Sequence, residues 1–293
     1  MDKLLVDFLQ QLIYGIITGS MYVTIAVGFS LLWGILNMLN FSHGEFFMLG
    51  GYLTYYSFTL YKINPFVSVF IAIIVVFFLG VGTFKFIIFP INKKPNWELN
   101  AIILTLGISI CLQNGALLIF GETYKGMPSF FDITVRFLGV AIGLDRLMIL
   151  LVGLALITFL LFFVTKTNTG LSMQAIAQDK NSALLMGINI KRVYLLTFGV
   201  SVALSGAAGA LLAPIYFIYP SVGFQPMLMA FSVVILGGLG NVKGAIFAGF
   251  LVGIIESFSI YLLSAAWKDI VIFSIIIIIL VIRPQGLFGL KET

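Results

Sequence analysis

The sequence predicts an all-α, polytopic integral membrane protein with about eight or nine transmembrane helices. Its 293 residues are 61% hydrophobic and only 9% charged, whereas a soluble domain is roughly 45–50% apolar and about 25% charged. Uncharged stretches recur along the chain, and the longest cover residues 8–42 and 193–242. About 20 apolar residues suffice to cross a bilayer core about 30 Å thick. These observations exclude an ordinary soluble globular domain.

Charges, prolines and polar clusters divide the chain into candidate spans. They lie at about 10–36, 44–61, 64–89, 99–120, 146–165, 193–217, 226–240, 244–264 and 268–282. The first uncharged run is too long for one perpendicular helix at about 1.5 Å per residue, so we expect it to break between Gly34 and Asn40. In the second long run, Pro214, Pro220 and Pro226 would interrupt a helix and predict two crossings with a turn between them.

The segment from 231 to 240 is short for a full span and rich in glycine near its end. Non-helical backbone at membrane depth is tolerated where protein or a water-filled cavity covers it. We therefore expect a broken or re-entrant helix near 231–244, which leaves the count at eight or nine. The longest polar segments, 121–145 and 166–192, are too short for a soluble domain, so residues 1–293 are predicted to form a single transmembrane domain.

Lysine and arginine indicate the orientation, because cytoplasmic loops of membrane proteins carry an excess of them. If the 166–192 segment is cytoplasmic, alternation through nine spans places ten of the 16 Lys and Arg residues inside. The sequence therefore favours an N-terminus outside the cell and a C-terminus inside it.

The segment 37–45 places polar groups where an apolar protein avoids them, and it holds the one histidine of the sequence. Ionisable side chains at membrane depth are expensive and mark transport pathways or internal pairs. We expect this segment and the glycine-rich break to form the substrate pathway, with Asn37, Asn40, Ser42, His43, Glu45, Gly237, Gly238 and Gly240 as its residues. A second interpretation, compatible with the first, is that Ser42 and Glu45 form a capping box for the next helix.

The segment 166–192 contains two short helical stretches that cannot cross a membrane at their length. A short amphipathic helix at the cytoplasmic surface either lies on the bilayer or docks into another protein. From the pattern alone, both interpretations stay open.

The sequence gives little support for a metal site, a nucleotide-binding site, a catalytic nucleophile or nucleic-acid binding. The single histidine has no second histidine or cysteine at metal-ligand spacing, so no metal site is expected. The glycine-rich segment 236–245 lacks the GxxxxGK[ST] order of a nucleotide cradle, and no GxSxG nucleophile motif is present. Basic residues lie in short loops, which disfavours nucleic-acid binding. Glu256 is a buried pathway carboxylate, the partner of Lys268 or Arg283 in an internal pair, or a residue at the membrane interface, and these interpretations stay open.

Glycines recur within the predicted spans. Gly15 with Gly19, and Gly249 with Gly253, have the GxxxG spacing that lets two helices approach closely in lipid. We expect these glycines to pack helices within the chain, with a subunit interface as the alternative. Cys111 has no cysteine or histidine partner nearby and is expected to serve packing.

Taken in order, these segments resemble the permease subunits of the high-affinity branched-chain amino acid ABC importers. The resemblance covers nearly the whole chain. It is carried by Gly19-Ser20-Met21-Tyr22, Asn40-Phe41-Ser42-His43-Gly44-Glu45, Ala177-Gln178-Asp179, Gly187-Ile188-Asn189, Leu204-Ser205-Gly206-Ala207-Ala208-Gly209, Val234-Ile235-Leu236-Gly237-Gly238-Leu239-Gly240 and Arg283-Pro284-Gln285-Gly286.

The resemblance implies a transport subunit, not an enzyme, that carries branched-chain amino acids into the cytoplasm across the bacterial cell membrane. Such a subunit binds no cofactor and has no ATPase site of its own, because two cytoplasmic ABC ATPases hydrolyse ATP. A second, similar but non-identical permease subunit completes the pathway. An extracytoplasmic binding protein delivers the substrate.

The resemblance also implies that the segment 166–192 is the loop that couples the permease to an ATPase. The residues at matching positions are Gln174, Ala175, Asp179, Ala183, Leu184, Gly187, Ile188 and Asn189. Relatives usually carry an arginine at the position of Gln174, so a charge contact with the ATPase is absent or moved in this chain.

Two questions stay open at the level of sequence. Related permeases carry urea, short amides or other amino acids, and one sequence does not distinguish these substrates. A rival function is an ion-coupled secondary transporter, in which Glu45 or Glu256 would carry a proton or a sodium ion. That rival would work without an ATPase partner.

Overall fold

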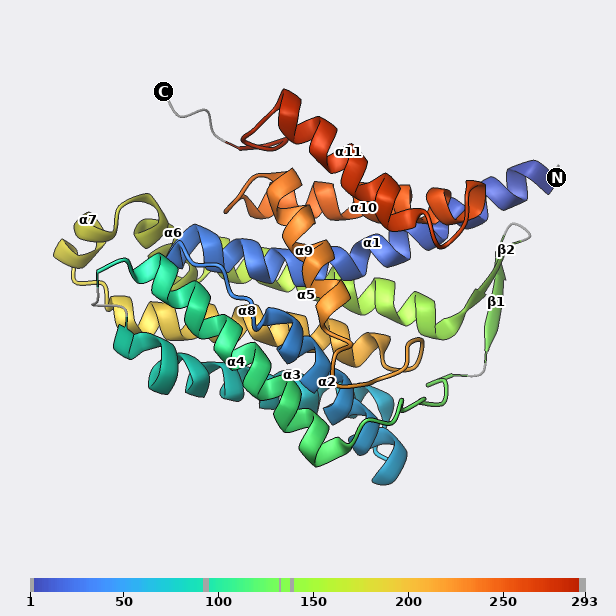
Figure 1. The fold of residues 1–293 in the computed structure, drawn as a ribbon, viewed down its shortest axis with the longest axis horizontal. Coiled ribbons are helices and arrows are strands. Elements are labelled where there is room, and N and C mark those ends of the chain that lie inside the picture. The colour runs from blue at the N-terminus through green and yellow to red at the C-terminus, as the bar shows by residue number, and fades with distance from the viewer. Residues whose placement is uncertain (1–2, 92–94, 132, 138–139, 290–293) are drawn as a thin grey trace.

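The computed structural model describes the chain except residues 1–2, 92–94, 132, 138–139 and 290–293. This described part contains eleven α-helices (Figure 1). Their bounds are α1 Lys3–Leu36, α2 His43–Tyr55, α3 Pro65–Thr83, α4 Trp97–Phe120, α5 Leu144–Lys166, α6 Asn168–Gln178, α7 Lys180–Leu185, α8 Ile190–Leu212, α9 Phe224–Gly237, α10 Val242–Leu262 and α11 Lys268–Ile282. A π-helical turn, Tyr56–Leu60, extends α2, and two short turns carry α3 on to Ile91. Each of the nine predicted spans contains one of these helices, and α6 and α7 are the two short helices predicted in 166–192.

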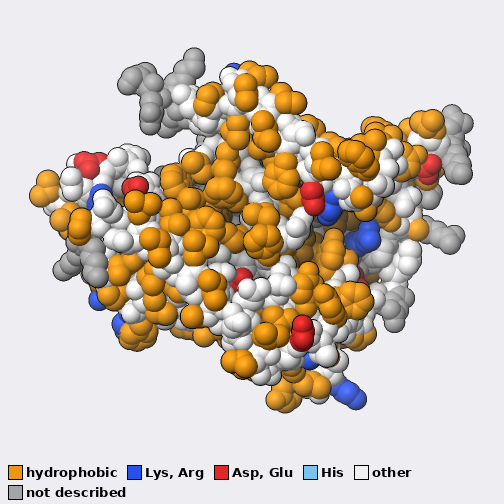
Figure 2. Space-filling model, viewed as in Figure 1, with side chains coloured by type: hydrophobic (Ala, Val, Ile, Leu, Met, Phe, Trp, Pro, Cys, Tyr) orange, Lys and Arg blue, Asp and Glu red, His pale blue; other side chains and the backbone are white. Residues whose placement is uncertain are grey.

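Six segments are long and apolar enough to cross a membrane, by length and composition. They are Leu4–Leu36, Pro65–Ile91, Trp97–Phe120, Leu144–Lys166, Ile190–Leu212 and Val242–Leu262. The helices α2, α9 and α11 have 13, 14 and 15 residues, fewer than the roughly 20 of a perpendicular span. The face seen in Figure 2 is dominated by hydrophobic side chains, as expected where lipid is the solvent. The polytopic helical fold is confirmed, whereas length alone supports six crossings among the described residues.

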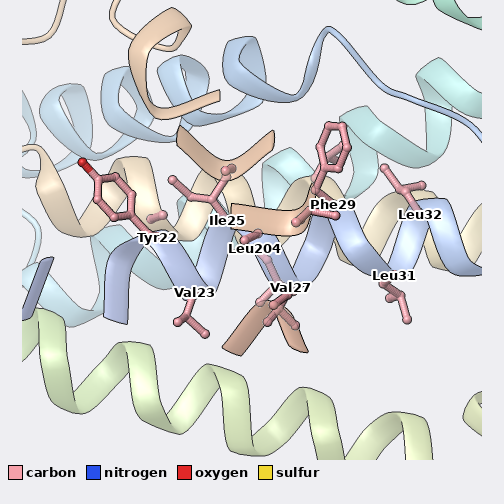
Figure 3. Close-up of a cluster of buried hydrophobic side chains, with 14 of the residues drawn as sticks. Tyr22, Val23, Ile25, Val27, Phe29, Leu31, Leu32 and Leu204 are labelled. Atoms are coloured by element: carbon pink, nitrogen blue, oxygen red, sulfur yellow. The ribbon is translucent and has the colours of Figure 1, made fainter. Parts of the chain in front are cut away.

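Helix α1 is the centre of the fold. It runs along most of the molecule (Figure 1) and packs against α5, α6, α8, α9 and α10. Figure 3 shows Val23 and Leu31 pointing to one side of the helix and Phe29 and Leu32 to the other, and all four are at most 3% exposed. A helix that is apolar all round belongs in an interior, which explains its long uncharged run. The helix ends at Leu36, within the interval where the sequence predicts a break.

Glycines allow the closest helix contacts. A Cβ atom built on Gly15 of α1 would lie 2.7 Å from a backbone atom of α10, and one built on Gly253 of α10 would overlap the backbone of Gly19. In the same way, Gly50 of α2 meets the backbone of Gly206 in α8. Any side chain at these positions would force two helices apart. The predicted packing of GxxxG pairs within the chain is confirmed.

A β-hairpin departs from the all-helical prediction. Strands β1, Thr134–Phe137, and β2, Val140–Gly143, pair antiparallel between α4 and α5. In β2, Val140 and Ile142 are buried while Ala141 is exposed, which is the alternation of a half-buried strand. Tyr14 of α1 donates a hydrogen bond from its hydroxyl to the carbonyl of Ala141 at 3.3 Å. The two strands therefore contact α1 at one end of the bundle.

The two ends of the molecule differ. Helices α6 and α7 lie at one end, here named the α6–α7 end, while the N-terminus and the hairpin lie at the opposite, hairpin end (Figure 1). At the α6–α7 end, the backbone N–H of Leu287 donates to the carbonyl of Leu236 at 2.8 Å. At the hairpin end, Lys125 and Ile218 form an antiparallel bridge. This arrangement agrees with the expectation that the N-terminus and the segment 166–192 face opposite sides of the membrane.

Replacing Gly253 by leucine should destabilise the protein by about 1–3 kcal/mol, because an added side chain must push α10 away from α1. The measurement is the melting temperature of the detergent-solubilised protein. Gly107→Leu on α4 is the matched control, since a Cβ atom there meets nothing within 4 Å. Equal melting temperatures for the two variants would contradict the proposed role of the α1–α10 contact.

Candidate functional site

The polar segment that follows α1 lies inside the helix bundle. Asn40, Ser42 and His43 have no exposed surface, and Glu45 is 6% exposed. Asn37 is different: it is exposed, has a φ of 49°, and donates its backbone N–H to the carbonyl of Trp33. The structure therefore brings four of the five predicted polar residues together and leaves Asn37 apart from them.

The predicted capping box is not formed. Ser42 occupies the N-cap position of α2, but its side chain makes no capping hydrogen bond. The side-chain oxygen of Asn40 instead accepts from the Ser42 backbone N–H at 3.1 Å and from the Ser42 hydroxyl at 2.6 Å. The Glu45 carboxylate accepts a hydrogen bond from the Ser109 hydroxyl at 2.9 Å. The side chain of Glu45 is thus turned toward α4, because α4 offers a donor that a sequence pattern around residue 42 does not reveal.

A polar stripe on α4 holds this segment. The Thr105 hydroxyl oxygen accepts from the backbone N–H of Phe41 at 3.2 Å, and Ser109 lies one turn further along. Residues four apart share one face of a helix. At the start of α4, the indole N–H of Trp97 donates to the carbonyl of Leu36 at 3.4 Å. The sequence analysis missed this stripe, although the four-residue spacing of Thr105 and Ser109 in an apolar helix was a usable signal.

His43 joins α2 to two other helices. Its ring nitrogen Nε2 lies 3.3 Å from the carbonyl of Ile25 in α1, so this nitrogen must carry the hydrogen for a bond to form. The ring meets Phe29 edge-on, with centroids 5.5 Å apart. The backbone carbonyl of His43 accepts from the hydroxyl of Ser205 in α8 at 2.8 Å. In this conformation the histidine ties α2 to α1 and α8.

Three buried polar atoms in this segment lack a hydrogen-bond partner among the described residues. They are the amide nitrogen Nδ2 of Asn40, the ring nitrogen Nδ1 of His43 and the carboxylate oxygen Oε2 of Glu45. Buried polar atoms normally find partners, and an unpaired one costs roughly 1–3 kcal/mol. With the hydrogen of His43 on Nε2, the amide nitrogen of Asn40 retains N–H groups to donate, whereas Nδ1 of His43 and Oε2 of Glu45 can accept.

The glycine-rich break is a tight turn between two helices. Helix α9 ends at Gly237 and α10 begins at Val242, which confirms the predicted break, and Gly238 and Gly240 have φ values of 101° and 78°. The side-chain amide of Asn241 donates to the carbonyl of Phe288 at 2.8 Å. No hydrogen bond among the described residues joins this turn to the buried polar segment. A pathway role for its glycines stays a prediction.

The turn also borders the segment 166–192. A cavity of about 140 Å³ lies between α1, α6 and the turn, with Gly34, Gly240 and Gln174 among its lining residues. The side-chain amide of Gln174 donates to the carbonyl of Val164 in α5 at 2.7 Å. Gln174 therefore anchors α6 to α5 in this structure.

Hydrogen bonds shape the two short helices. The hydroxyl oxygen of Thr167 accepts from the backbone N–H of Gly170 at 3.1 Å at the start of α6. Asp179 caps α7: it accepts from the hydroxyl of Ser182 and, at 2.9 Å, from the backbone N–H of Asn181. These bonds hold the pKa of Asp179 below its ordinary value. The cap is therefore present above the ordinary aspartate pKa and is lost as the pH falls through the lowered one.

Four predicted coupling residues, Asp179, Leu184, Gly187 and Asn189, are exposed, whereas Gln174, Ala175 and Ile188 are half-buried and Ala183 is buried. Leu184, Leu185 and Met186 are 60%, 87% and 83% exposed. These three apolar side chains project together from the end of α7. They form an apolar tip at the α6–α7 end.

Glu256 is part of an internal pair. Its carboxylate lies 2.8 Å from the ammonium of Lys268 and accepts a hydrogen bond from the Tyr22 hydroxyl at 2.6 Å. These contacts connect α10 to α11 and α1. Of the two predicted partners, Lys268 is correct, whereas Arg283 donates instead to the carbonyl of Leu287 at 3.4 Å.

Comparison with known proteins places the whole chain in one group. The sequence model of the family described as "Branched-chain amino acid transport system / permease component" matches residues 11–280. The chain is 32% identical to the high-affinity branched-chain amino acid transport system permease protein BraD of Pseudomonas aeruginosa, over 97% of each chain. It is 32% identical to the corresponding protein LivH of Escherichia coli, over 100% of this chain and 99% of that one. It is 24% identical to the E. coli permease protein LivM, over 92% of this chain and 68% of LivM. No solved structure matches it.

Replacing Lys268 by methionine should destabilise the protein by roughly 1–3 kcal/mol, because it leaves the buried Glu256 carboxylate with only the Tyr22 hydroxyl. The effect stays below that of a fully buried pair because the Lys268 side chain is 26% exposed. Thermal unfolding in detergent is the measurement, with Lys62→Met in an exposed loop as the control. Adding Glu256→Gln to Lys268→Met should recover most of the lost stability. A double variant no more stable than Lys268→Met would refute the pairing.

Proposed function

The chain belongs to the family of branched-chain amino acid transport system permease components, and from this premise we propose that it forms the pathway of an ATP-driven importer for branched-chain amino acids. It is a multi-pass permease of the bacterial cell membrane. The single domain of residues 1–293 would cross the bilayer eight or nine times, with α2, α9 and α11 as the shorter crossings. The chain itself would hydrolyse no ATP and bind no cofactor.

The observation that supports this pathway best is the set of unpartnered atoms in the buried polar segment. The free carboxylate oxygen of Glu45 would accept a hydrogen bond from the ammonium of an amino acid. The amide of Asn40 would donate to its carboxylate, and apolar neighbours such as Met38 and Phe46, each 1% exposed, would suit an aliphatic side chain. Asn37 and the turn at 237–240 would belong to the exit at the α6–α7 end.

A second permease subunit would complete the pathway. LivH and LivM of E. coli are both named as permease proteins of a high-affinity branched-chain amino acid transport system, and the chain is similar to both. We therefore favour a heterodimer of two similar, non-identical subunits. An extracytoplasmic binding protein would deliver the substrate at the hairpin end.

The apolar tip would dock into a cytoplasmic ABC ATPase. Leu185 and Met186 are exposed at the α6–α7 end, and exposed apolar clusters of this kind mark protein contacts. Asp179 and Gly187 fix the shape of the tip, the first as the cap of α7 and the second through its φ of 80°. Movement of the ATPases would reach the bundle through α6, which Gln174 anchors to α5.

The rival function is an ion-coupled secondary transporter. Glu256 is a poor ion carrier in this structure because Lys268 and Tyr22 already occupy both of its oxygens. Glu45, with one hydroxyl partner and one free oxygen, is the residue on which the rival would depend. The two functions differ in their energy source.

Glu45→Gln should lower ATP-driven uptake of leucine into proteoliposomes by roughly tenfold or more, because a hydrogen bond to a charged group contributes about 1.5–3 kcal/mol. The assay uses the permease with its co-purified subunits and the binding protein, with Glu98→Gln on the exposed start of α4 as the control. Uptake that proceeds without ATP and collapses with the ion gradient would establish the rival. Unchanged ATP-driven uptake would remove Glu45 from the pathway.

Gly187→Val should uncouple ATP hydrolysis from transport, because a β-branched residue at a φ of 80° distorts the tip. Transport per ATP hydrolysed should fall several-fold while the subunits still assemble. Gly121→Val is a matched control at the other end of the molecule: it also has a φ of 80°, and a Cβ atom at either position meets nothing within 4 Å. If both variants transport normally, the tip is not the coupling element.

A further inference from the structure

A cleft opens sideways in the bundle between α3 and α5. Its volume is about 370 Å³, and its lining includes Phe77 and Phe78 of α3, Phe159 and Phe163 of α5, and Leu196 and Ala203 of α8. Both α3 and α5 pack against α8, whereas the described residues of α3 and α5 make few contacts with each other. The cleft is thus a gap between two helices, with α8 as its floor.

The lining of the cleft is suited to a hydrocarbon chain. Apart from the Thr169 side chain at its α6 end, every lining residue is apolar. Cavities lined only by leucine, isoleucine and phenylalanine stay dry and take up apolar guests. The cleft lies at the depth of three membrane-spanning helices, where the surrounding solvent is acyl chains. An acyl chain is therefore the guest that the lining favours.

The α6–α7 end of the cleft carries positive charge. Lys166 follows the lining residue Phe163 by three positions, and Arg192 precedes the lining residue Leu196 by four. Residues three or four apart share a helix face, so both basic side chains continue the cleft toward the membrane surface. Lys85, just after the end of α3, adds a third cation on the side of the cleft that α3 forms, and its ammonium lies over the ring of its neighbour Phe86, 5.2 Å from the centroid. All three side chains are exposed.

No carboxylate among the described residues forms an ion pair with these three basic side chains. The carboxylate of Asp179 accepts hydrogen bonds from Ser182 and Asn181. The ammonium of Lys180 lies over the ring of Tyr194, and that of Lys191 over the ring of Phe89. Lys166 and Arg192 form no ion pair among the described residues. Basic pockets between transmembrane helices on the cytoplasmic side are suited to anionic lipid head groups.

We propose that this cleft is a binding site for an anionic phospholipid. One acyl chain fills the cleft between α3 and α5, and the phosphate lies among Lys166, Arg192 and Lys85. Because Thr169 of α6 also lines the cleft, the bound lipid contacts the first of the two coupling helices as well as α5 and α8. Through its contact with Thr169, the bound lipid stabilises the position of α6 against α5 and α8. This site is independent of the transported substrate.

The test is native mass spectrometry of the full chain in detergent, with phosphatidylglycerol and phosphatidylcholine of identical acyl chains. The unmodified protein should retain phosphatidylglycerol in preference to phosphatidylcholine. Lys166→Gln combined with Arg192→Gln should reduce that preference by roughly thirtyfold, since each of the two basic residues near a membrane surface contributes about 1 kcal/mol. Ala203→Leu, which fills the floor of the cleft, should lower the binding of both lipids.

Lys243→Gln combined with Arg283→Gln is the matched control, because both residues are exposed beside α10 and α11, away from the cleft. This pair should keep the preference for phosphatidylglycerol. Equal retention of the two lipids by the unmodified protein, or an equal loss in the control pair, would overturn the proposal. A crosslink from Phe159→Cys to another polypeptide would also overturn it, because the cleft would then be a subunit interface.

Discussion

The structure depends on the close packing of α1 inside a ring of other helices. Lipid supplies no hydrophobic force that drives helices together, so contact between backbones and side chains must hold the bundle. Gly15 and Gly19 of α1 lie against α10, and Gly28 lies against the backbone of Ser201 in α8. The Ser201 hydroxyl also donates to the carbonyl of Gly28 at 2.6 Å. Because α1 is held this closely, the position of the segment 37–42 that follows it, and of α2 after that, is fixed as well.

One consequence is the burial of a polar segment that a membrane protein would otherwise keep at its surface. The chain leaves α1 at Leu36 and re-enters the bundle within seven residues, where α2 begins at His43. Hydrogen bonds to α1, α4 and α8 hold the segment there. Ser109 satisfies only one oxygen of Glu45, so the other carboxylate oxygen stays buried without a partner among the described residues. Burial and incomplete pairing are the features on which the proposed pathway role of this segment rests.

A second consequence is that the two ends of the bundle have different structures. At the hairpin end, β1, β2 and the Lys125–Ile218 bridge close the bundle with strand-like contacts. At the α6–α7 end, two short helices project an apolar tip while Gln174 ties the first of them to α5. A rigid bundle with an anchored, exposed tip is suited to receive force from a partner protein. The proposed lipid in the cleft between α3 and α5 would also contact α6, so α6 would be held by a lipid as well as by α5.

The sequence by itself determined the positions of the nine helices expected as spans, the break after Gly237 and the two short helices in 166–192, whereas the choice of Lys268 as the partner of Glu256 came from the fold. The helices and the break follow from local hydrophobic runs, glycines and the scarcity of charge, which are visible without a fold. Tertiary structure alone decided that Glu45 turns to Ser109 and not back to cap its own helix, that Gln174 faces α5, and that a hairpin covers one end. Each of these depends on a partner brought close only by folding: Ser109 lies 64 positions from Glu45, and the Tyr14 that contacts β2 lies 127 positions from Ala141. Local pattern reports the propensity of a segment, whereas a side chain's partner depends on which distant segment packs beside it.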